Sequence, residues 1–304
     1  MLLSFSLRLP VSALGATLMA GLLPAGLFAQ TEAVAMRLRW QPGHAYTQET
    51  MTETTTVLTA IGQPTDQKLK VNQTTRIDVA TTEKGGKEAR VTFTALTGEM
   101  LMQGKTYTFD SANMAVAHPL IRESLGQSLG TSFVLMYGPD DEFAGVRDTG
   151  SMVKAADGNP SLTGIAEAKD VAELYRRSLE MGLPKMKVKA GDRWTSEETV
   201  KFPSAGLVSS ELRARFDAVV DYRGRRHAKI SFEGDLKGTG GVSPAGVALG
   251  TGSKTFGQVL FDLEGATVSF AAFRAEIFLE VSGKRIPVRQ QVTTRLVSVE
   301  PPLK

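Results

Sequence analysis

The sequence predicts an α+β protein, mainly antiparallel β, in which two duplicated curved β-sheet lobes are joined by a helical middle segment. Three observations lead to this fold class. Apolar and polar residues alternate along most of the 304-residue chain, as in strands with one buried face. One strand-turn-strand unit occurs twice. Between the copies, the apolar period lengthens from two to between three and four residues.

The repeated unit covers residues 76–94 and 215–233, which align without a gap. Five positions are identical and five more keep size or charge. The identical pairs are Arg76/Arg215, Asp78/Asp217, Gly85/Gly224, Ala89/Ala228 and Phe93/Phe232. Each copy has a glycine at the centre of its turn, where a positive φ is favoured, with basic residues on either side. Each copy is therefore predicted to be a β-hairpin.

A second match extends the repeat. Any two amphipathic hairpins share some alternation, so the first match alone leaves coincidence open. Residues 43–49 precede the first hairpin much as residues 191–197 precede the second, with glycine at 43 and 191 and an aromatic residue at 46 and 194. The same order of both matches along the chain predicts an internal duplication.

The first 29 residues predict a signal peptide, because Arg8 gives a weakly basic start and residues 11–28 are apolar with only small or Gly/Pro interruptions. Cleavage after Ala29 leaves Gln30 first. A small-x-small site at residues 33–35 could extend the removed segment to 35. An uncleaved anchor is the alternative, which Pro24 and the small residues disfavour. We expect a bacterial protein that is periplasmic or extracellular, with no stable transmembrane segment after signal removal.

Composition excludes several classes of site. The chain has no cysteine, which excludes disulfides, a thiolate nucleophile and cysteine-bound metal. Removing residues 1–29 takes away only Arg8, leaving 34 basic and 32 acidic side chains. Because the basic residues are scattered along the strands, the pI of about 9.0 does not predict a nucleic-acid partner.

Residues 36–114 are expected to form the N-terminal β lobe. Residues 36–40 alternate like a short strand, and a Gln-Pro-Gly turn separates them from a long threonine-rich strand over residues 45–59. The first repeated hairpin follows. A further strand over residues 101–111 ends at Phe109 and Asp110.

Residues 115–187 are expected to be the helical connecting segment. Pro119 and Gly130 suit the first turn and the cap of a short helix, and residues 167–181 form the clearest helix, which Gly182 and Pro184 end. Between them, the pattern predicts a strand over residues 132–137 and a turn over 138–142.

Residues 188–304 are expected to form the C-terminal β lobe. In its hairpin, alternate residues from Leu212 to Tyr222 share one face. Residues 234–252 contain seven glycines and few bulky side chains, which predicts a mobile loop that could gate a site. Phe261 and Asp262 match Phe109 and Asp110. The apolar side then changes parity, which predicts a β-bulge near Ala271 and Ala272.

No catalytic, cofactor or metal site is predicted. His44, His118 and His227 lack neighbouring ligands at metal-binding spacing, and His227, just past a hairpin turn, is expected to be exposed. Ser151 and Lys154 have the Ser-x-x-Lys spacing of a known nucleophile but lack its partner motifs. Residues 250–255 lack the Gly-Lys pair of a phosphate loop, so we interpret them as loop.

The remaining candidates are assigned structural tasks. Asp140, Asp141 and Glu142 are interpreted as a solvated turn, because the ligand spacing of a calcium loop is missing. Asp78 and Asp217 recur in both lobes, which favours ion pairing with a basic residue on the neighbouring arm over catalysis. The aromatic residues at strand starts are expected to anchor the core rather than bind a ligand; they are Trp40, Tyr46 and Trp194.

The order of these features resembles an uncharacterised family of exported bacterial β-rich proteins. The resemblance is carried by the signal peptide, a Gly-x-x-Tyr opening strand, the Tyr-Thr-Phe-Asp-Ser strand at residues 107–111, a Gly-Asp-x-Trp motif at 191–194 and the closing hairpin with Arg-Ile-Pro-Val-Arg-Gln-Gln at 285–291. It covers nearly the whole mature chain. These motifs are structural, so the resemblance implies no known reaction, ligand or partner.

We expect a non-enzymatic binding or carrier protein for an apolar ligand or a cell-envelope component, with curved sheets cupping the ligand. The alternative is a structural or protein-interaction module of the envelope, which uses strand edges and threonine-rich faces to engage a partner. An apolar cavity would favour the carrier, and a filled core with a flat exposed patch would favour the interaction module. The sequence assigns no ligand-binding residues.

Overall fold

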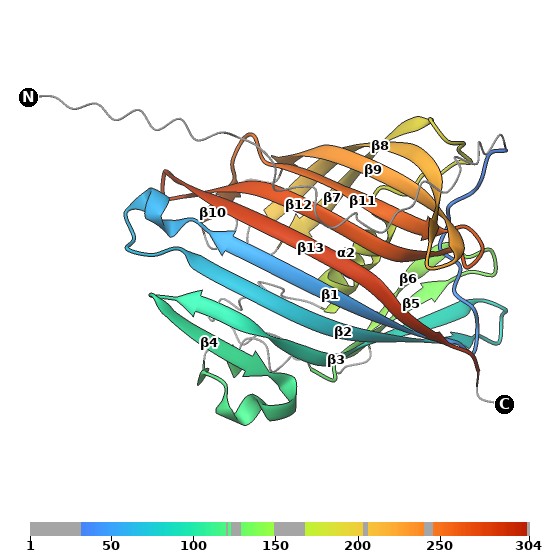
Figure 1. Ribbon diagram of the computed structural model, residues 1–304, viewed down its shortest axis with the longest axis horizontal. Helices are drawn as coiled ribbons and strands as arrows, with labels where there is room; N and C mark the ends of the chain where they lie inside the picture. Colours follow the sequence, from blue (N-terminus) through green and yellow to red (C-terminus); the bar gives the residue numbers. More distant parts are fainter. Residues whose placement is uncertain are drawn as a thin grey trace, which may run out of the picture.

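A computed structural model describes residues 32–119, 121–122, 129–148, 168–202, 206–239 and 246–302, and within them the strands form one large antiparallel sheet that is not closed (Figure 1). This is the predicted mainly antiparallel β fold. The strands are β1 (Ala45–Thr56), β2 (Gln67–Thr81), β3 (Lys87–Met102), β4 (Lys105–Asp110), β5 (Ser132–Tyr137), β6 (Phe143–Asp148), β7 (Arg193–Phe202), β8 (Gly206–Tyr222), β9 (Arg225–Gly238), β10 (Val247–Leu249), β11 (Lys254–Asp262), β12 (Thr267–Val281) and β13 (Lys284–Glu300). The helices are η1 (Leu58–Ile61), η2 (Ser111–Val116) and α2 (Ala168–Glu180).

The two halves of the chain share this sheet through β13. The strand order is β6-β5-β3-β2-β1-β13-β12-β11-β9-β8-β7, with β4 added beside β3 and β10 beside β12. β13 pairs with β12 on one side and with β1 on the other, where Ala45 lies opposite Glu300 and Thr56 opposite Val288. The sequence left open whether there are two sheets or one, and the structure shows one.

Both copies of the repeated unit are hairpins in corresponding places, because β1-β2-β3-β5 and β7-β8-β9-β11 follow the same local order. Ile77 lies opposite Val91, Phe216 lies opposite Ile230, and all four side chains are fully buried. The turns differ in length. The second turn consists of Arg223 and Gly224 with φ of 56° and 75°, the positive values that a two-residue type I′ hairpin requires.

The bulges in β8 and β12 bear on predictions made from the sequence. In β8 the pairing passes from Phe216 directly to Ala218, so Asp217 is the extra residue and the buried side moves to Val219. The prediction of one face from Leu212 to Tyr222 is therefore wrong beyond Phe216. In β12 the extra residue is Ser269, so the predicted bulge exists but lies two residues before Ala271.

The expected match between residues 109–110 and 261–262 is wrong. β11 runs along β9 without interruption, with Asp262 opposite His227. In the first half that place is divided between two strands, since β5 pairs with residues 87–92 of β3 and β4 pairs with residues 97–102. Phe109 packs in a smaller second cluster with Leu96, Met100, Ala117 and Ile121.

The main core lies on the inner face of the sheet, the face covered by α2, which lies behind the sheet in Figure 1. Ala172 and Leu179 of α2 are buried there, and the Tyr175 ring meets Phe93 and Phe133 edge-on at 6.4 and 5.7 Å. The helix confirms the one predicted over residues 167–181. Of the other predicted helix, residues 119, 121 and 122 are helical, and residues 120 and 123–128 lie outside the described residues.

The segment before β1 is buried without being a strand. Met36, Leu38 and Trp40 are 2, 4 and 2% exposed, which confirms the predicted alternation. Its backbone makes few hydrogen bonds: Val34 exchanges two with Val188, and the Arg39 N–H donates to the Ala266 carbonyl. Alternation requires only an extended chain with one buried side, so it does not distinguish a strand from this segment.

α2 contacts both edges of the open sheet. The Arg176 guanidinium lies 4.4 Å from the centre of the Phe143 ring on edge strand β6, an element that the sequence pattern did not predict. Arg177 Nη1 lies 3.0 Å from Glu198 Oε2 on edge strand β7. The helix therefore holds the two edges together from the inner side. None of the helices in the described part of the chain is long and apolar enough to span a membrane.

The prediction of a mobile loop over residues 234–252 is wrong for most of its length. Gly234 and Gly238 belong to β9, and β10 pairs with β12. Ser253, which follows this stretch directly, is 1% exposed. Its hydroxyl donates to the Gly250 carbonyl and accepts from the Phe278 N–H, so the turn at residues 250–253 is fixed to β12. Residues 240–245 lie outside the described residues. Close strand packing accounts for Gly234, where a Cβ would lie 2.4 Å from the Leu212 side chain, whereas Gly246 has open space around it and a positive φ.

Candidate functional site

The residues that the sequence analysis considered and rejected as sites lie in several environments. Residues 151–154 lie outside the described residues. His227 is 2% exposed, not exposed as expected, because the bulge at Ser269 gives it a partner. Its Nδ1 lies 2.9 Å from the Arg225 carbonyl oxygen and its Nε2 lies 2.8 Å from Ser269 Oγ. Among the described residues, no group of three or more His, Asp or Glu side chains could hold a metal ion.

Two of the three carboxylates in the turn at residues 140–142 form ion pairs. Asp141 pairs with Lys87 and its side chain is only 12% exposed, so the interpretation as a solvated turn is wrong for Asp141. Glu142 is exposed and lies 3.5 Å from Arg37. Arg76 Nε lies 3.0 Å from Asp78 Oδ1, so this pair runs along one strand and not between arms as expected. In the second copy, Arg215 is 3.9 Å from Asp217, which also accepts a 3.0 Å hydrogen bond from Ser231 on β9.

The three aromatic residues at strand starts are buried, as predicted. Trp40 and Tyr46 are each 2% exposed and meet edge-on at 5.1 Å. Burial raises the pKa of Tyr46, whose hydroxyl accepts a hydrogen bond from the Gln41 N–H. Trp194 is 9% exposed, and its indole N–H has no hydrogen-bond partner among the described residues. Trp194 lies in the floor of a surface groove, but its ring is on the core side, opposite buried Ala214.

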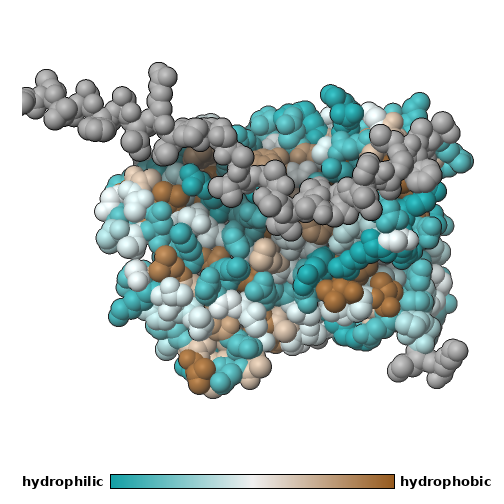
Figure 2. Space-filling model, viewed as in Figure 1, coloured by the Kyte–Doolittle hydropathy of each residue, from teal (hydrophilic) through white to brown (hydrophobic). Residues whose placement is uncertain are grey.

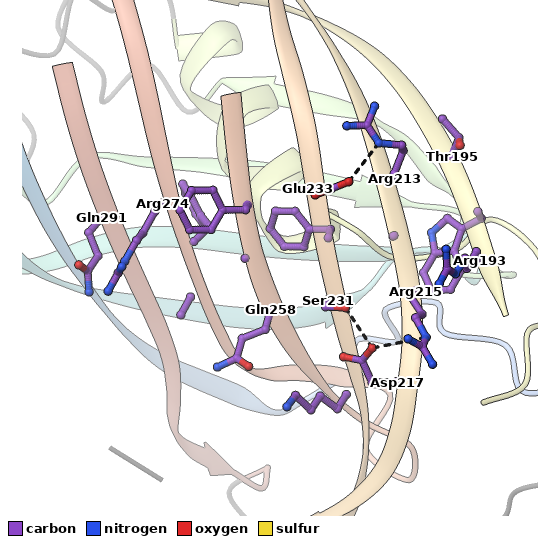
Figure 3. A pocket seen from close by; sticks show the side chains of 18 residues that line it. Arg193, Thr195, Arg213, Arg215, Asp217, Ser231, Glu233, Gln258, Arg274 and Gln291 are labelled. Carbon is purple, nitrogen blue, oxygen red and sulfur yellow. Dashed lines mark hydrogen bonds and ion pairs between the residues drawn. The ribbon is translucent and has the colours of Figure 1, made fainter. Parts of the chain in front are cut away.

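This outer groove crosses strands β7, β8, β9, β11, β12 and β13 and has a volume of about 830 Å³. Figure 3 shows it from the face opposite α2, which is visible behind the strands. Alternation along each strand brings the side chains there, since residues 213, 215 and 217 of β8 and 229, 231 and 233 of β9 point away from the core. The outward side of the β8–β9 hairpin next to the β8 bulge thus forms part of the groove.

The groove is rich in positive charge. Its described lining contains five basic side chains and two acidic ones, namely Arg193, Arg213, Arg215, Lys229 and Arg274 against Asp217 and Glu233. Arg213 is neutralised by Asp235 at 3.1 Å and Glu233 at 3.4 Å, and its pKa is raised by hydrogen bonds to these carboxylates. Arg193, Lys229 and Arg274 form no ion pair within the described part of the chain.

Arg193 and Arg215 are direct neighbours across the β7–β8 ladder. Like charges placed opposite each other on adjacent strands destabilise a sheet. Asp217 compensates only in part, because it lies 3.9 Å from Arg215 and also serves Ser231 (Figure 3). The arrangement costs stability and concentrates positive charge at one end of the groove.

Apolar side chains complete the lining. Phe256 on β11 is 39% exposed, and Ala272 of β12 also lines the groove. Gly257 lies in the floor of the groove, and a Cβ there would lie on the core side, 2.4 Å from the Ala272 carbonyl oxygen and 2.7 Å from the Phe232 ring. Separate hydrophobic patches among hydrophilic side chains are visible over the outer face in Figure 2. The alternation in the sequence indicates which of these residues face outward. It does not indicate that six strands bring them into one groove.

A second groove, of about 850 Å³, lies between the segment at residues 35–39, the turn at 139–143 and the link from α2 to β7. Its lining is mixed in charge, with four basic residues and five acidic ones among those described. Burial raises the pKa of Glu180 there, against the opposing effect of Arg176. The balance of charges gives this second groove no preference for either sign of ligand.

Comparisons with known proteins bear only on the fold. No family model and no curated protein matches the sequence. Lipovitellin, in a structure concerned with its lipid–protein interactions, is similar at 11% identity with a TM-score of 0.49, over 88% of this chain. The chain spans only 26% of the length of lipovitellin. A candidate lipoprotein from Parabacteroides distasonis is similar at 10% identity with a TM-score of 0.30, over 88% of this chain and 100% of its own.

These comparisons agree with the resemblance to a family that brings no known activity. The identities and TM-scores are too low to transfer any property to this chain. The assignment of function therefore depends on the grooves.

Proposed function

We propose that the protein is an exported, non-enzymatic binding or carrier protein of the bacterial cell envelope, and that its ligand is an amphiphilic envelope component held in the outer groove. One observation carries the proposal: an 830 Å³ groove in which exposed Phe256 and Ala272 lie beside basic side chains. The volume is in the range of small-molecule sites, about 300–1,000 Å³.

The position of the groove changes the expected mode of binding. The sequence predicts curved sheets that cup an apolar ligand, and a filled core with a flat exposed patch would favour the interaction module instead. The inner face is filled by a core cluster that includes α2 and the segment before β1. A ligand in the outer groove would lie on the surface, with part of it in water. An amphiphile suits such a site better than a wholly apolar molecule, because its polar part stays hydrated.

The proposal is tested by purifying the protein from an exporting bacterial host and recording native mass spectra. A bound mass is expected with the wild type and with Val297→Ser, since Val297 is 44% exposed but lies outside the groove. Phe256→Ser, which removes an apolar contact of similar exposure, is expected to lose most of it. Absence of any bound molecule, or equal retention by Phe256→Ser, would contradict the proposal. Robust turnover of a panel of hydrolase substrates would overturn its non-enzymatic part.

One observation favours the interaction module as a second candidate. β7 ends the strand order, so in the described part of the chain one side of its backbone has no strand neighbour. An exposed edge can accept a strand from another protein. Cross-linking in the host separates the candidates, because a protein partner captured through residues 193–202, with no bound small molecule, is the result expected for the module alone.

A further inference from the structure

We infer that the outer groove recognises a phosphate-bearing head group, and that the Arg193–Arg215 pair is the recognition element. This inference rests on the proposed function and specifies its ligand as an anionic amphiphile. The head group would lie at the β7–β8 end and the apolar part would extend towards Phe256 and Ala272.

The first argument is the unpaired charge. Arg193 lies opposite Arg215, and within the described residues Arg193 has no carboxylate partner, while Arg215 shares one distant carboxylate, Asp217, with Ser231. Two guanidinium groups on adjacent strands can each present a planar pair of N–H donors to one phosphate. Bound phosphate would convert the repulsion between the two guanidinium groups into two attractive contacts.

The second argument is orientation. Successive residues of a strand point to opposite faces, so Arg193 and Arg215 lie together on the outer face, while the next pair of the ladder, Trp194 and Ala214, is buried in the core. Both arginines are exposed, so both can meet a ligand that approaches from solvent.

The third argument is the length of the site. Lys229 extends the basic row on β9, and Arg274 lies on β12, three strand spacings from β8, or about 14 Å. Phe256 and Gln258 of β11 lie between these ends. A free phosphate ion would fill only one end of such a groove. An amphiphile with a phosphate head can contact the arginine pair and the apolar side chains together.

The test measures co-sedimentation of the full chain with vesicles. Vesicles of phosphatidylcholine doped with phosphatidic acid are compared with phosphatidylcholine alone and with vesicles carrying the same negative charge as oleate. The wild type is expected to bind the phosphatidic acid vesicles best, with binding that weakens as salt rises. Arg193→Gln with Arg215→Gln is expected to bind them about tenfold or more weakly, because each variant loses charge-assisted hydrogen bonds.

A matched double variant, Lys68→Gln with Arg90→Gln, removes the same charge from exposed positions outside the groove, so its binding should stay within about twofold of the wild type. Equal loss in both double variants would show non-specific attraction and overturn the inference. Equal binding to oleate vesicles would overturn the phosphate assignment. Binding of inorganic phosphate by the free protein, with no co-sedimentation with phosphatidic acid vesicles, would show that the site takes the free ion and not the lipid.

Stability provides an independent readout. Replacing Arg193 alone by Gln relieves the like-charge contact, so the ligand-free protein should unfold at a higher temperature while vesicle binding falls. A structural role for Arg193 predicts the opposite change in Tm. Failure here is distinguishable from failure of the proposed function: if the Arg193/Arg215 variant keeps a co-purifying ligand that Phe256→Ser loses, the groove binds but the head-group assignment is wrong.

Discussion

His227 shows how one inserted residue turns an ordinary turn position into a buried one. Ser269, the extra residue of the β12 bulge, lies 2.8 Å from His227 Nε2. The Arg225 carbonyl can only accept, so Nδ1–H donates to it, while Nε2 is hydrogen-bonded to the Ser269 hydroxyl. Both ring nitrogens have partners, so the ring can be buried. A sequence pattern does not reveal this, because the partner lies on another strand.

The equivalent phenylalanines of the two hairpins are expected to be energetically similar. Phe93 and Phe232 are 9 and 5% exposed, so replacing either by alanine should cost about 3–5 kcal/mol of unfolding free energy. Phe256→Ala, at 39% exposure, should cost less than about 1 kcal/mol. Chemical denaturation measures all three. A loss below about 1 kcal/mol at Phe232 would place that ring outside the core.

Gly234 is predicted to be required for strand packing and not for flexibility. A Cβ at this position would lie 2.4 Å from Leu212 Cδ2 and 2.7 Å from the Glu211 carbonyl oxygen. Gly234→Ala should therefore destabilise the protein by about 1–3 kcal/mol. At Gly238, in the same strand, the nearest atom to a Cβ is 3.4 Å away, so Gly238→Ala should change stability by about 0.5 kcal/mol at most. Equal effects in thermal unfolding would contradict this reading.

At the scale of elements, α2 carries two carboxylates whose pKa values move in opposite directions. The pKa of Glu180 is raised because burial disfavours its charged form. The pKa of Glu173 is lowered, chiefly by its hydrogen bond from Arg176. A raised carboxyl pKa contributes stability at low pH that is lost as pH rises through it. A lowered one contributes stability above the ordinary value of 4.5 that is lost as pH falls.

The two substitutions should therefore have opposite pH profiles. Relative to the wild type, Glu180→Gln should gain stability as pH rises above the ordinary glutamate pKa, because it removes a buried charge. Glu173→Gln should lose stability relative to the wild type as pH rises towards 4.5, in a window below that of Glu180. Urea unfolding at a series of pH values from about 3 upward measures both differences. Profiles of the same sign would show that α2 does not hold these side chains as described.

Some elements could be predicted and others could not. The hairpins, the strand at residues 132–137 and α2 follow from local periodicity, and a parity change correctly indicated a bulge in β12. The segment at residues 36–40 and the glycine-rich stretch were assigned wrongly for a shared physical reason. Periodicity and composition indicate which side chains are buried. Whether a segment is a strand depends on whether a neighbouring backbone forms hydrogen bonds with it, and that neighbour can be distant in sequence. β6 was missed because its six residues show little alternation.

At the scale of the whole molecule, the shared sheet joins the two halves into one structure. Each half supplies strands on one side of the β1–β13 ladder, and α2 contacts both outer edges. The edge strand β1 of the first half is thus paired with the edge strand β13 of the second half. We expect unfolding to be a single cooperative transition.

The two tryptophans of the chain provide the measurement. Trp40 packs before β1 and Trp194 lies in β7, so Trp40→Phe and Trp194→Phe each leave one probe, in different halves. Denaturation of both variants should give a fluorescence midpoint equal to that from circular dichroism of the same variant. Separate midpoints for the two signals would mean that the halves unfold independently.

The candidate site shows where sequence reasoning stops. The alternation in β8 and β9 correctly placed Arg213, Arg215 and Lys229 on the polar side. Nothing local indicated that Arg193 would lie opposite Arg215, since that contact depends on the β7–β8 register. Arg274 and Phe256 join the groove only because β11 and β12 lie next to β9. The groove is a property of strand order, which follows from pairings distant in sequence.

The central ladder joins the first strand of the sheet to the last, with Ala45 opposite Glu300. During synthesis, β1 can pair with β2 as soon as both are made, but its other edge must wait for nearly the entire chain. Contacts between distant segments slow folding, and an unpaired edge invites pairing with other chains meanwhile. Most residues of β1 are polar, and threonine is the commonest among them. While the edge of β1 is unpaired, this composition makes association with other chains less favourable than it would be for an apolar strand.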